Sequence, residues 1–145
     1  MLTMHPLEPG ELRDAAQLCP RDPNALLGHL RWCMCTPYAE AFSMRLGPKV
    51  LGVATLVHFG TTSRVGCFHI HQAHQRKGLG TLLALHLRNV QDQEDRSTLM
   101  VQAAPQEAAF WERLEFTEQC TFTTYANGHF IEASRDEVAL MEPAH

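Results

Sequence analysis

The stretch HQRKGLGTLL, His74–Leu83, places two cations and two glycines at the start of a long apolar segment. From Gly78 onward, apolar side chains recur at spacings of three and four residues, which predicts an amphipathic helix. The helix is predicted to bury one face against the sheet, made of Leu79, Leu82, Leu83, His86 and Val90. Glycine is a poor helix former, so two glycines in a first turn cost stability unless the backbone must come close to another group.

That other group is predicted to be an anion. A helix N-terminus exposes unpaired amides and a partial positive charge, and glycines let a phosphate reach them. We therefore predict a pyrophosphate cradle built from the amides of about residues 76 to 81, with Arg76 and Lys77 adding charge at its rim. The spacing fits neither a Walker loop nor a dinucleotide-binding Gly-x-Gly-x-x-Gly. The alternative for Gly78-Leu79-Gly80 by itself is a connection that only lets helix and strand pack closely.

The segments before this helix predict strands and two helices. Three apolar segments, residues 39–47, 49–59 and 64–71, are separated by Gly47-Pro48 and by the turn at 60–63, which predicts an antiparallel meander. Residues 10–19 and 25–34 have helical spacing, the second after a turn at Asp22-Pro23-Asn24 that is a plausible N-cap. A short extended segment opens the chain.

The segments after the helix complete the fold. STLMVQAA, residues 97–104, is predicted to lie parallel to residues 64–71, since a long helical connection implies a crossover. Residues 106–116 form a further helix, and 120–133 form two strands around Asn127-Gly128. The tail is either a strand or a short helix. We predict one α+β domain over residues 1–145, with a mixed, mostly antiparallel sheet of six to seven strands flanked by about four helices.

Charge is unevenly distributed along the 145 residues. The formal net charge is −4, yet no Asp or Glu lies between Glu40 and Asp92. The cations inside that segment are Arg45, Lys49, Arg64, Arg76, Lys77 and Arg88. An acidic chain with a basic middle favours a local anion site and argues against nucleic acid as a partner. The alternative is that buried strands exclude carboxylates anyway.

The remaining composition predicts a cytoplasmic protein. No apolar run approaches the ~18 residues of a membrane span, and the N-terminus lacks the basic start and apolar core of a secretory signal. We therefore expect no membrane partner. The five cysteines are an odd number without a paired framework, which favours reduced thiols in a cytoplasm.

Gln75-Arg76-Lys77-Gly78-Leu79-Gly80 matches the Q/R-x-x-G-x-G/A signature of the GCN5-related N-acetyltransferases (GNAT). The chain resembles this family along nearly its whole length, because the predicted elements fall in the family's order. AAFWERLEF, residues 108–116, is similar to the family's later A-x-x-F-Y-x-x-x-G-F segment.

The resemblance implies acetyl-CoA, or a related acyl-CoA, as cofactor. Its pyrophosphate would lie on the loop that begins at Gln75, against the backbone amides of Arg76, Lys77, Gly78, Leu79, Gly80 and Thr81. The pantetheine arm would pair with the open edge of the strand that carries Phe68, Ile70 and His71, as an added strand pairs with a sheet. The following parallel strand would splay away to leave a cleft for the cofactor.

Three positions depart from the family pattern. Trp111 stands where a tyrosine commonly protonates the leaving thiolate, and an indole N–H cannot serve as an acid near neutral pH. Ala104 replaces a frequent asparagine, and Glu115 replaces the glycine of the Gly-Phe pair. The pyrophosphate-binding signature of the family is therefore complete in this chain, whereas the later family segment departs from its pattern.

Acyl transfer to an amine needs a proton acceptor, and the strand before the signature offers histidines. Cys67, His69 and His71 share one face of that strand, while Phe68 and Ile70 point the other way. Imidazole titrates near neutral pH, so His69 and His71 are the candidate catalytic bases. The alternatives are that these histidines line a polar cleft without reacting, or that the amine loses its proton to bulk water. Tyr125 and His129 are candidates for the missing acid, against ordinary hairpin packing.

A metal site is not predicted. His69-x-His71 with His58 or His74, and Cys33-x-Cys35 with His29, have ligand-like residue types, but no second pair at zinc spacing follows. The resemblance implies an N-acetyltransferase that passes an acyl group to a primary amine, on a small molecule or a protein, by direct attack. A catalytically impaired acyl-CoA sensor is the alternative, and a partner-binding module with an empty cleft is a third. We expect a monomer or homodimer.

Overall fold

The computed structural model describes residues 1–75, 77–96, 98–101, 107–114, 125–126 and 129–130. Its elements, with η for a 3₁₀ helix, are β1 (Leu2–Pro6), η1 (Pro9–Glu11), α1 (Leu12–Ala16), α2 (Pro23–Met34), β2 (Ala39–Leu46), β3 (Lys49–Phe59), β4 (Thr62–Ile70), η2 (Gln72–His74), α3 (Leu79–Gln93), β5 (Thr98–Met100), α4 (Ala108–Arg113), β6 (Tyr125–Ala126) and β7 (His129–Phe130).

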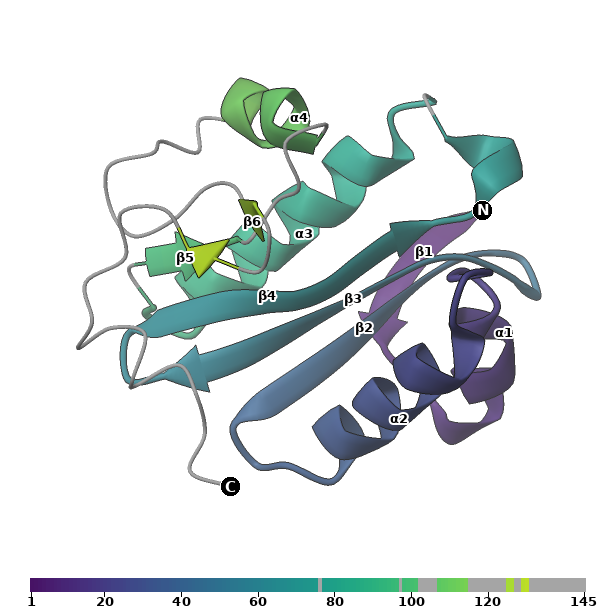
Figure 1. The fold of residues 1–145 in the computed structure, drawn as a ribbon, viewed down its shortest axis with the longest axis horizontal. Coiled ribbons are helices and arrows are strands. Elements are labelled where there is room, and N and C mark those ends of the chain that lie inside the picture. Colours follow the sequence, from purple (N-terminus) through teal and green to yellow (C-terminus); the bar gives the residue numbers. More distant parts are fainter. Residues whose placement is uncertain (76, 97, 102–106, 115–124, 127–128, 131–145) are drawn as a thin grey trace.

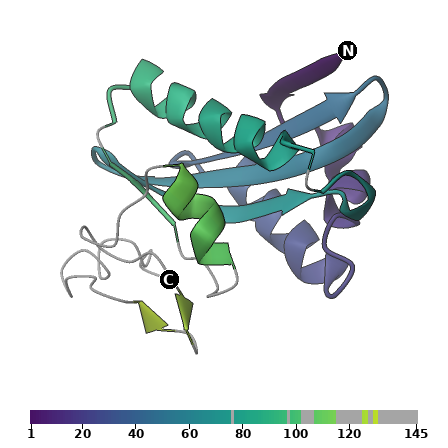
Figure 2. The same ribbon diagram turned by 90° about the horizontal axis from the view of Figure 1, so that it is seen from above.

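Five strands form one mixed sheet in the order β1-β2-β3-β4-β5, in which only β4 and β5 run parallel. The helices α1 and α2 cover one face of this sheet and α3 covers the other (Figures 1 and 2). β6 and β7 pair antiparallel with each other as a separate two-stranded ladder. The α+β fold, the three-strand meander and the parallel crossover predicted from the sequence are confirmed.

The boundaries follow local chemistry. α2 begins where Asp22 accepts a hydrogen bond of 3.0 Å from the Ala25 amide, so the predicted N-cap is confirmed. β2 and β3 meet at Gly47, which adopts a φ of 59° that glycine tolerates without strain. The predicted strand over residues 97–104 is described only at Thr98–Met100, and the tail lies outside the described residues.

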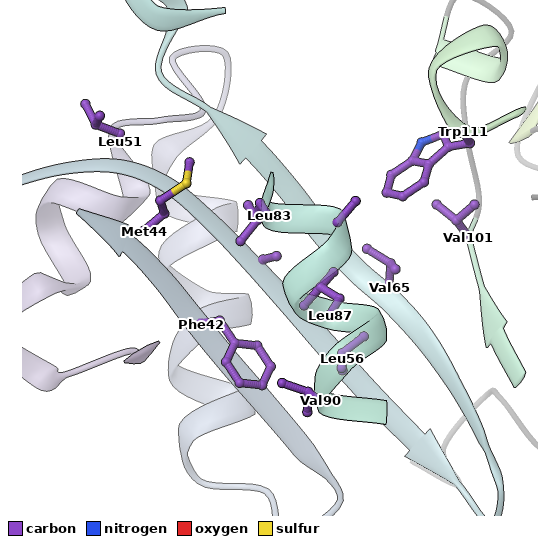
Figure 3. Close-up of a cluster of buried hydrophobic side chains, with 12 residues drawn as sticks. Phe42, Met44, Leu51, Leu56, Val65, Leu83, Leu87, Val90, Val101 and Trp111 are labelled. Atoms are coloured by element: carbon purple, nitrogen blue, oxygen red, sulfur yellow. The ribbon is translucent and has the colours of Figure 1, made fainter. Parts of the chain in front are cut away.

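Two apolar cores hold the layers together. On the α3 side, Leu83 and Leu87 of the helix pack on Met44, Leu56 and other strand residues, all buried (Figure 3). On the other side, α1 and α2 bury a second cluster that includes Leu26, Leu30, Val53 and Val57. Both faces of β3 are covered, so nine consecutive residues of that strand, 50–58, are buried. This is why β3 lacks the apolar–polar alternation of a one-sided strand.

β4 contains a bulge that decides which way its last residues face. Thr55 pairs with Cys67, but Leu56 pairs with Val65, so Gly66 is left without a partner in the ladder. Val65, Phe68 and Ile70 consequently contact the α3-side core, whereas Cys67 packs on the α2 side. The predicted division between Cys67 on one face and Phe68 and Ile70 on the other is what the structure shows.

Gly66 is also a site of close backbone approach. A Cβ atom there would lie 2.6 Å from Thr55 Oγ1 and 2.9 Å from His29 Nε2, two atoms joined by a hydrogen bond of 2.8 Å. We expect Gly66→Ala to break that bond and lower the free energy of unfolding by about 2 kcal/mol, as measured by urea denaturation.

Gly28→Ala is the matched control for this substitution. Gly28 lies within α2 and a Cβ there meets nothing within 4 Å, so alanine should leave stability unchanged or raise it by about 0.5–1 kcal/mol. A Gly66→Ala protein as stable as the unmodified protein would show that the bulge does not need glycine.

Candidate active site

The first feature of the site is the free outer edge of β4. β5 pairs with β4 only at Thr62–Arg64, and β5 ends at Met100 while β4 continues to Ile70. From Val65 to Ile70, no strand within the described part of the chain lies against this edge. Its backbone amides and carbonyls are therefore open to an extended ligand that adds to the sheet.

The second feature is the N-terminus of α3. Gly78 is the N-cap in the left-handed region, with φ at 80°, and no side chain caps the helix. The first helical hydrogen bond runs from the Leu82 amide to the Gly78 carbonyl at 3.2 Å, so the amides of residues 79–81 have no acceptor one turn back. This helix is 15 residues long, and its dipole adds positive potential at these amides.

The connection between these two features is fixed by hydrogen bonds. The His71 amide donates to the Leu51 carbonyl at 2.8 Å, which keeps the chain on β3 just after β4 ends. Gln75 Nε2 donates to the Ile70 carbonyl at 3.2 Å, so the loop folds back on the last residue of β4. The open strand edge and the bare amides are thereby held next to each other.

A cavity of about 740 Å³ contains both features. It is lined by residues of β4, of the loop into α3, of α4 and of the α1–α2 connection: Leu18, Cys19, Pro20, Arg21, Phe68, His69, Ile70, Gln72, Gln75, Gly78, Gly80, Thr81, Glu107, Phe110, Trp111 and Arg113. The size and the mixture of apolar and polar walls are typical of a site for a small organic ligand.

Three aromatic rings form one wall of the cavity. The ring centroids of Phe68 and Trp111 are 5.0 Å apart, and Phe110 lies 5.0 Å from Trp111 and 5.9 Å from Phe68. Trp111 is only 3% exposed and belongs to the α3-side core (Figure 3). A Cβ on Gly80 would lie 3.3 Å from the Phe110 ring, so glycine at this position keeps the aromatic wall close to the helix N-terminus.

The two candidate bases have different surroundings. His69 is half-buried in the cavity wall, and burial lowers the pKa of its imidazole, which favours the neutral form that accepts a proton. His71 follows the end of β4 and is absent from the cavity wall; its Nδ1 accepts a hydrogen bond of 3.2 Å from the Ala73 amide. Its ring lies 5.4 Å from that of His74.

The other titratable groups differ in whether they are free to take part in proton transfer or nucleophilic attack. Burial raises the pKa of the Cys67 thiol to about 12 and that of Cys33 to about 11, so both remain protonated at neutral pH. Partial burial also raises the pKa of the Glu107 carboxyl group, and Glu107 is one of the residues that line the cavity. Glu11, which does not line the cavity, accepts a hydrogen bond of 2.9 Å from the Ser43 hydroxyl and lies 3.1 Å from His5 Nε2.

The structure gathers seven predicted residues in the cavity wall, namely Phe68, His69, Ile70, Gln75, Gly78, Gly80 and Thr81. Lys77 is exposed and Leu79 packs on the core, and neither side chain lines the cavity. Arg76, Ala104 and Glu115 lie outside the described residues. Tyr125 and His129 occupy facing strands of the β6–β7 ladder, and only their backbone is described.

Sequence reasoning missed the α1–α2 connection, Glu107 and Arg113. Pro20 signals the end of a helix, but nothing local indicates that the residues around it reach a strand almost fifty positions later. Glu107 could have been found as the single acidic residue beside the second family segment, just before its first alanine.

Comparisons with known proteins show the family and the fold. The family model for the acetyltransferase (GNAT) domain matches residues 34–131, which is more than half of the chain. No curated protein matches the chain.

Solved structures share the fold. A transcriptional regulator from Bacillus halodurans C-125 has a TM-score of 0.70 at 14% identity, over 81% of this chain and 93% of its own. The ribosomal-protein-S18-alanine N-acetyltransferase from Escherichia coli has a TM-score of 0.68 at 19% identity, over 79% of this chain and 75% of its own. PaiA N-acetyltransferase from Thermoplasma acidophilum, in complex with coenzyme A, has a TM-score of 0.66 at 8% identity, over 79% of this chain and 87% of its own. At these identities the likeness shows the fold alone.

Proposed function

The chain belongs to the GNAT acetyltransferase family, and from that premise we propose that it transfers the acetyl group of acetyl-CoA to a primary amine by direct attack. One observation carries the proposal. The open edge of β4 and the uncapped amides of α3 share one cavity, as a ligand with an extended amide-bearing arm and a diphosphate requires.

The residues present fit such a ligand. The amides of Leu79, Gly80 and Thr81 would donate to the diphosphate oxygens, because no side chain caps this helix and its N-cap is a glycine in the left-handed region. Lys77, exposed beside them, adds positive charge. The backbone of β4 beyond Arg64 binds the two amide groups of the pantetheine arm. When bound, acetyl-CoA supplies an activated acyl group.

His69 accepts the proton that the amine loses. It lies in the same cavity wall as Phe68, whose strand edge binds the arm, and its lowered pKa keeps the imidazole neutral at neutral pH. His71 bonds to the Ala73 amide at 3.2 Å and holds the turn into the loop, so we assign it a positioning role there.

Direct attack requires that no side chain carries the acyl group between the two substrates. Cys67 and Cys33 have raised pKa values and remain weak nucleophiles at neutral pH. Among the described residues, Cys19 is the thiol that lines the cavity. An acyl group found on Cys19 by peptide mass spectrometry after acetyl-CoA addition would contradict direct attack.

The acceptor enters from the side of the α1–α2 connection. Leu18 and Pro20 supply apolar surface there, and Glu107 supplies a carboxylate in the cavity wall that attracts a cationic amine. We propose a small-molecule amine or an exposed amine of a protein as acceptor, and the protein as a monomer or homodimer. The ribosomal-protein-S18-alanine N-acetyltransferase above, which shares the fold, acts on an amine.

An acyl-CoA-binding sensor is the second candidate. Trp111, at the position where the family often has a tyrosine acid, is buried in the core and packs edge-on against Phe68, so an indole occupies the place of that acid. A protein with an intact diphosphate site and no acid would bind acyl-CoA without turning it over.

Assays with a panel of amines distinguish an acetyltransferase from an acyl-CoA-binding sensor. With acetyl-CoA and a thiol-reactive dye, we expect at least one primary amine to raise the rate of CoA release about tenfold or more above hydrolysis. The panel should include polyamines, aminoglycosides and lysine- and alanine-ended peptides. A rate that no amine raises, together with a thermal shift on adding acetyl-CoA, would favour the sensor. No thermal shift at all would contradict both functions.

A further inference from the structure

Two carboxylates and a histidine meet at the end of the sheet opposite the acyl-transfer cavity. Glu40 is the second residue of β2, His58 lies near the end of β3, and Glu94 follows the last turn of α3. One donor atom from each lies within 4.8 Å of the other two. His58 Nε2 is 2.6 Å from Glu40 Oε2 and 3.8 Å from Glu94 Oε1.

The histidine is buried and held in one orientation. Its side chain is 5% exposed, and its Nδ1 shares a hydrogen bond of 2.7 Å with the hydroxyl of Ser63, which is itself fully buried. Because Ser63 engages Nδ1, Nε2 is the nitrogen that faces the two carboxylates. A polar partner on the far ring nitrogen is what fixes metal-binding histidines in proteins.

The carboxylates can adjust around this fixed nitrogen. The Glu40 and Glu94 side chains are 36% and 34% exposed, so both can rotate at little cost. Tetrahedral ligands at about 2.0–2.1 Å from a Zn²⁺ ion lie roughly 3.3 Å from one another. Small side-chain rotations bring the three donors from their present separations to that spacing.

The local charge also favours a cation. Glu40 and Glu94 bring two negative charges to one imidazole, and Arg96 contacts Glu94 Oε1 at 3.2 Å. With the His58 imidazole neutral, two carboxylates and one guanidinium leave a net negative charge, which attracts a cation to His58 Nε2. Imidazole with carboxylate oxygens is a donor set that suits Zn²⁺ and its neighbours among the transition metals.

We propose that Glu40, His58 and Glu94 bind one divalent transition-metal ion, Zn²⁺ in the first instance, as a structural site that ties β2 and β3 to the end of α3. None of the three residues lines the acyl-transfer cavity. His58 is five residues along β3 from Val53, the partner of His69, a separation of about 16 Å. The structure therefore separates His58 from His69, and the proposed site is not the combination of these two histidines that the sequence analysis considered.

The test is calorimetric titration of the metal-stripped protein with Zn²⁺, paired with thermal unfolding. We expect one ion bound per chain with micromolar or tighter affinity, and an unfolding temperature raised by about 4 °C or more in excess Zn²⁺. Glu94→Gln and Glu40→Gln each keep the side chain's shape and remove a charged ligand, so each should weaken binding at least tenfold and abolish the thermal shift.

Glu112→Gln is the matched control, because Glu112 is exposed on α4, outside this cluster, and should leave both readouts unchanged. Binding that survives equally in the Glu40 and Glu94 variants would place the ion on other histidines and overturn the proposal. No binding to the unmodified protein would also overturn it and leave the cluster as an ion-pair network. Circular dichroism of each variant confirms that it folds.

Discussion

Gly80→Glu is expected to abolish coenzyme A binding, with affinity lowered by at least about 100-fold. The new carboxylate would lie beside the amides of α3 that we assign to the diphosphate, and like charges placed together cost several kcal/mol. Its Cβ would also lie 3.3 Å from the Phe110 ring, which would have to shift. Isothermal titration with coenzyme A and with acetyl-CoA measures the loss.

Two further variants separate the effect of the added charge from the effect of the added Cβ atom. Gly80→Ala adds the Cβ without the charge, so the Phe110 ring must move by a few tenths of an ångström, and we expect about a tenfold loss or less. Gly28→Glu makes the same charge change on α2, where a Cβ meets nothing within 4 Å, and should bind normally. Full affinity in Gly80→Glu would disprove the diphosphate cradle, whatever the acceptor amine is.

His69→Ala is expected to lower kcat on the order of 100-fold with little change in acetyl-CoA affinity, since general base catalysis typically contributes that much. Burial lowers the pKa of His69, so the imidazole is neutral at pH 7 and becomes protonated only as the pH falls below the usual histidine range. The unmodified enzyme should therefore lose kcat/KM on the acid side, with a midpoint below about 6.5, and stay flat above it.

The pH profile distinguishes a base from a structural residue. His69→Ala should lose the acid limb as well as the rate, whereas His71→Ala tests the competing candidate that bonds to the Ala73 amide. A larger loss of kcat in His71→Ala than in His69→Ala would transfer the role to His71. Two variants that both keep the rate and the limb would mean that the amine loses its proton to bulk water.

Much of the fold could be predicted because local signals were strong. The long β3 begins and ends at residues 49 and 59 as predicted, since turn residues flank a valine-rich run. The crossover from β4 through α3 to a parallel β5 followed from chain connectivity. The sheet itself differs in detail: five strands are joined in one sheet, and β6 and β7 form a ladder of their own among the described strands.

The sequence predicted which backbone positions form the candidate site, but it predicted the surroundings of the side chains only in part. Gly78 and Gly80 could be assigned from sequence, because a left-handed N-cap and a close approach leave a glycine signature. The separate environments of His69 and His71 could not, because period-two alternation places them on the same face and does not show that β4 ends at Ile70. The bulge at Gly66 was equally invisible, since it depends on the register with β3.

The sequence by itself determined the order of elements, the helix that begins with bare amides and the family resemblance, because periodicity, turn residues and a six-residue signature act over short distances. Only the tertiary structure decided that Arg21 and Glu107 reach the cavity, that Trp111 is a buried wall, and that a histidine of β3 meets glutamates of β2 and α3. Such contacts join residues far apart along the chain, so their geometry depends on how the layers pack.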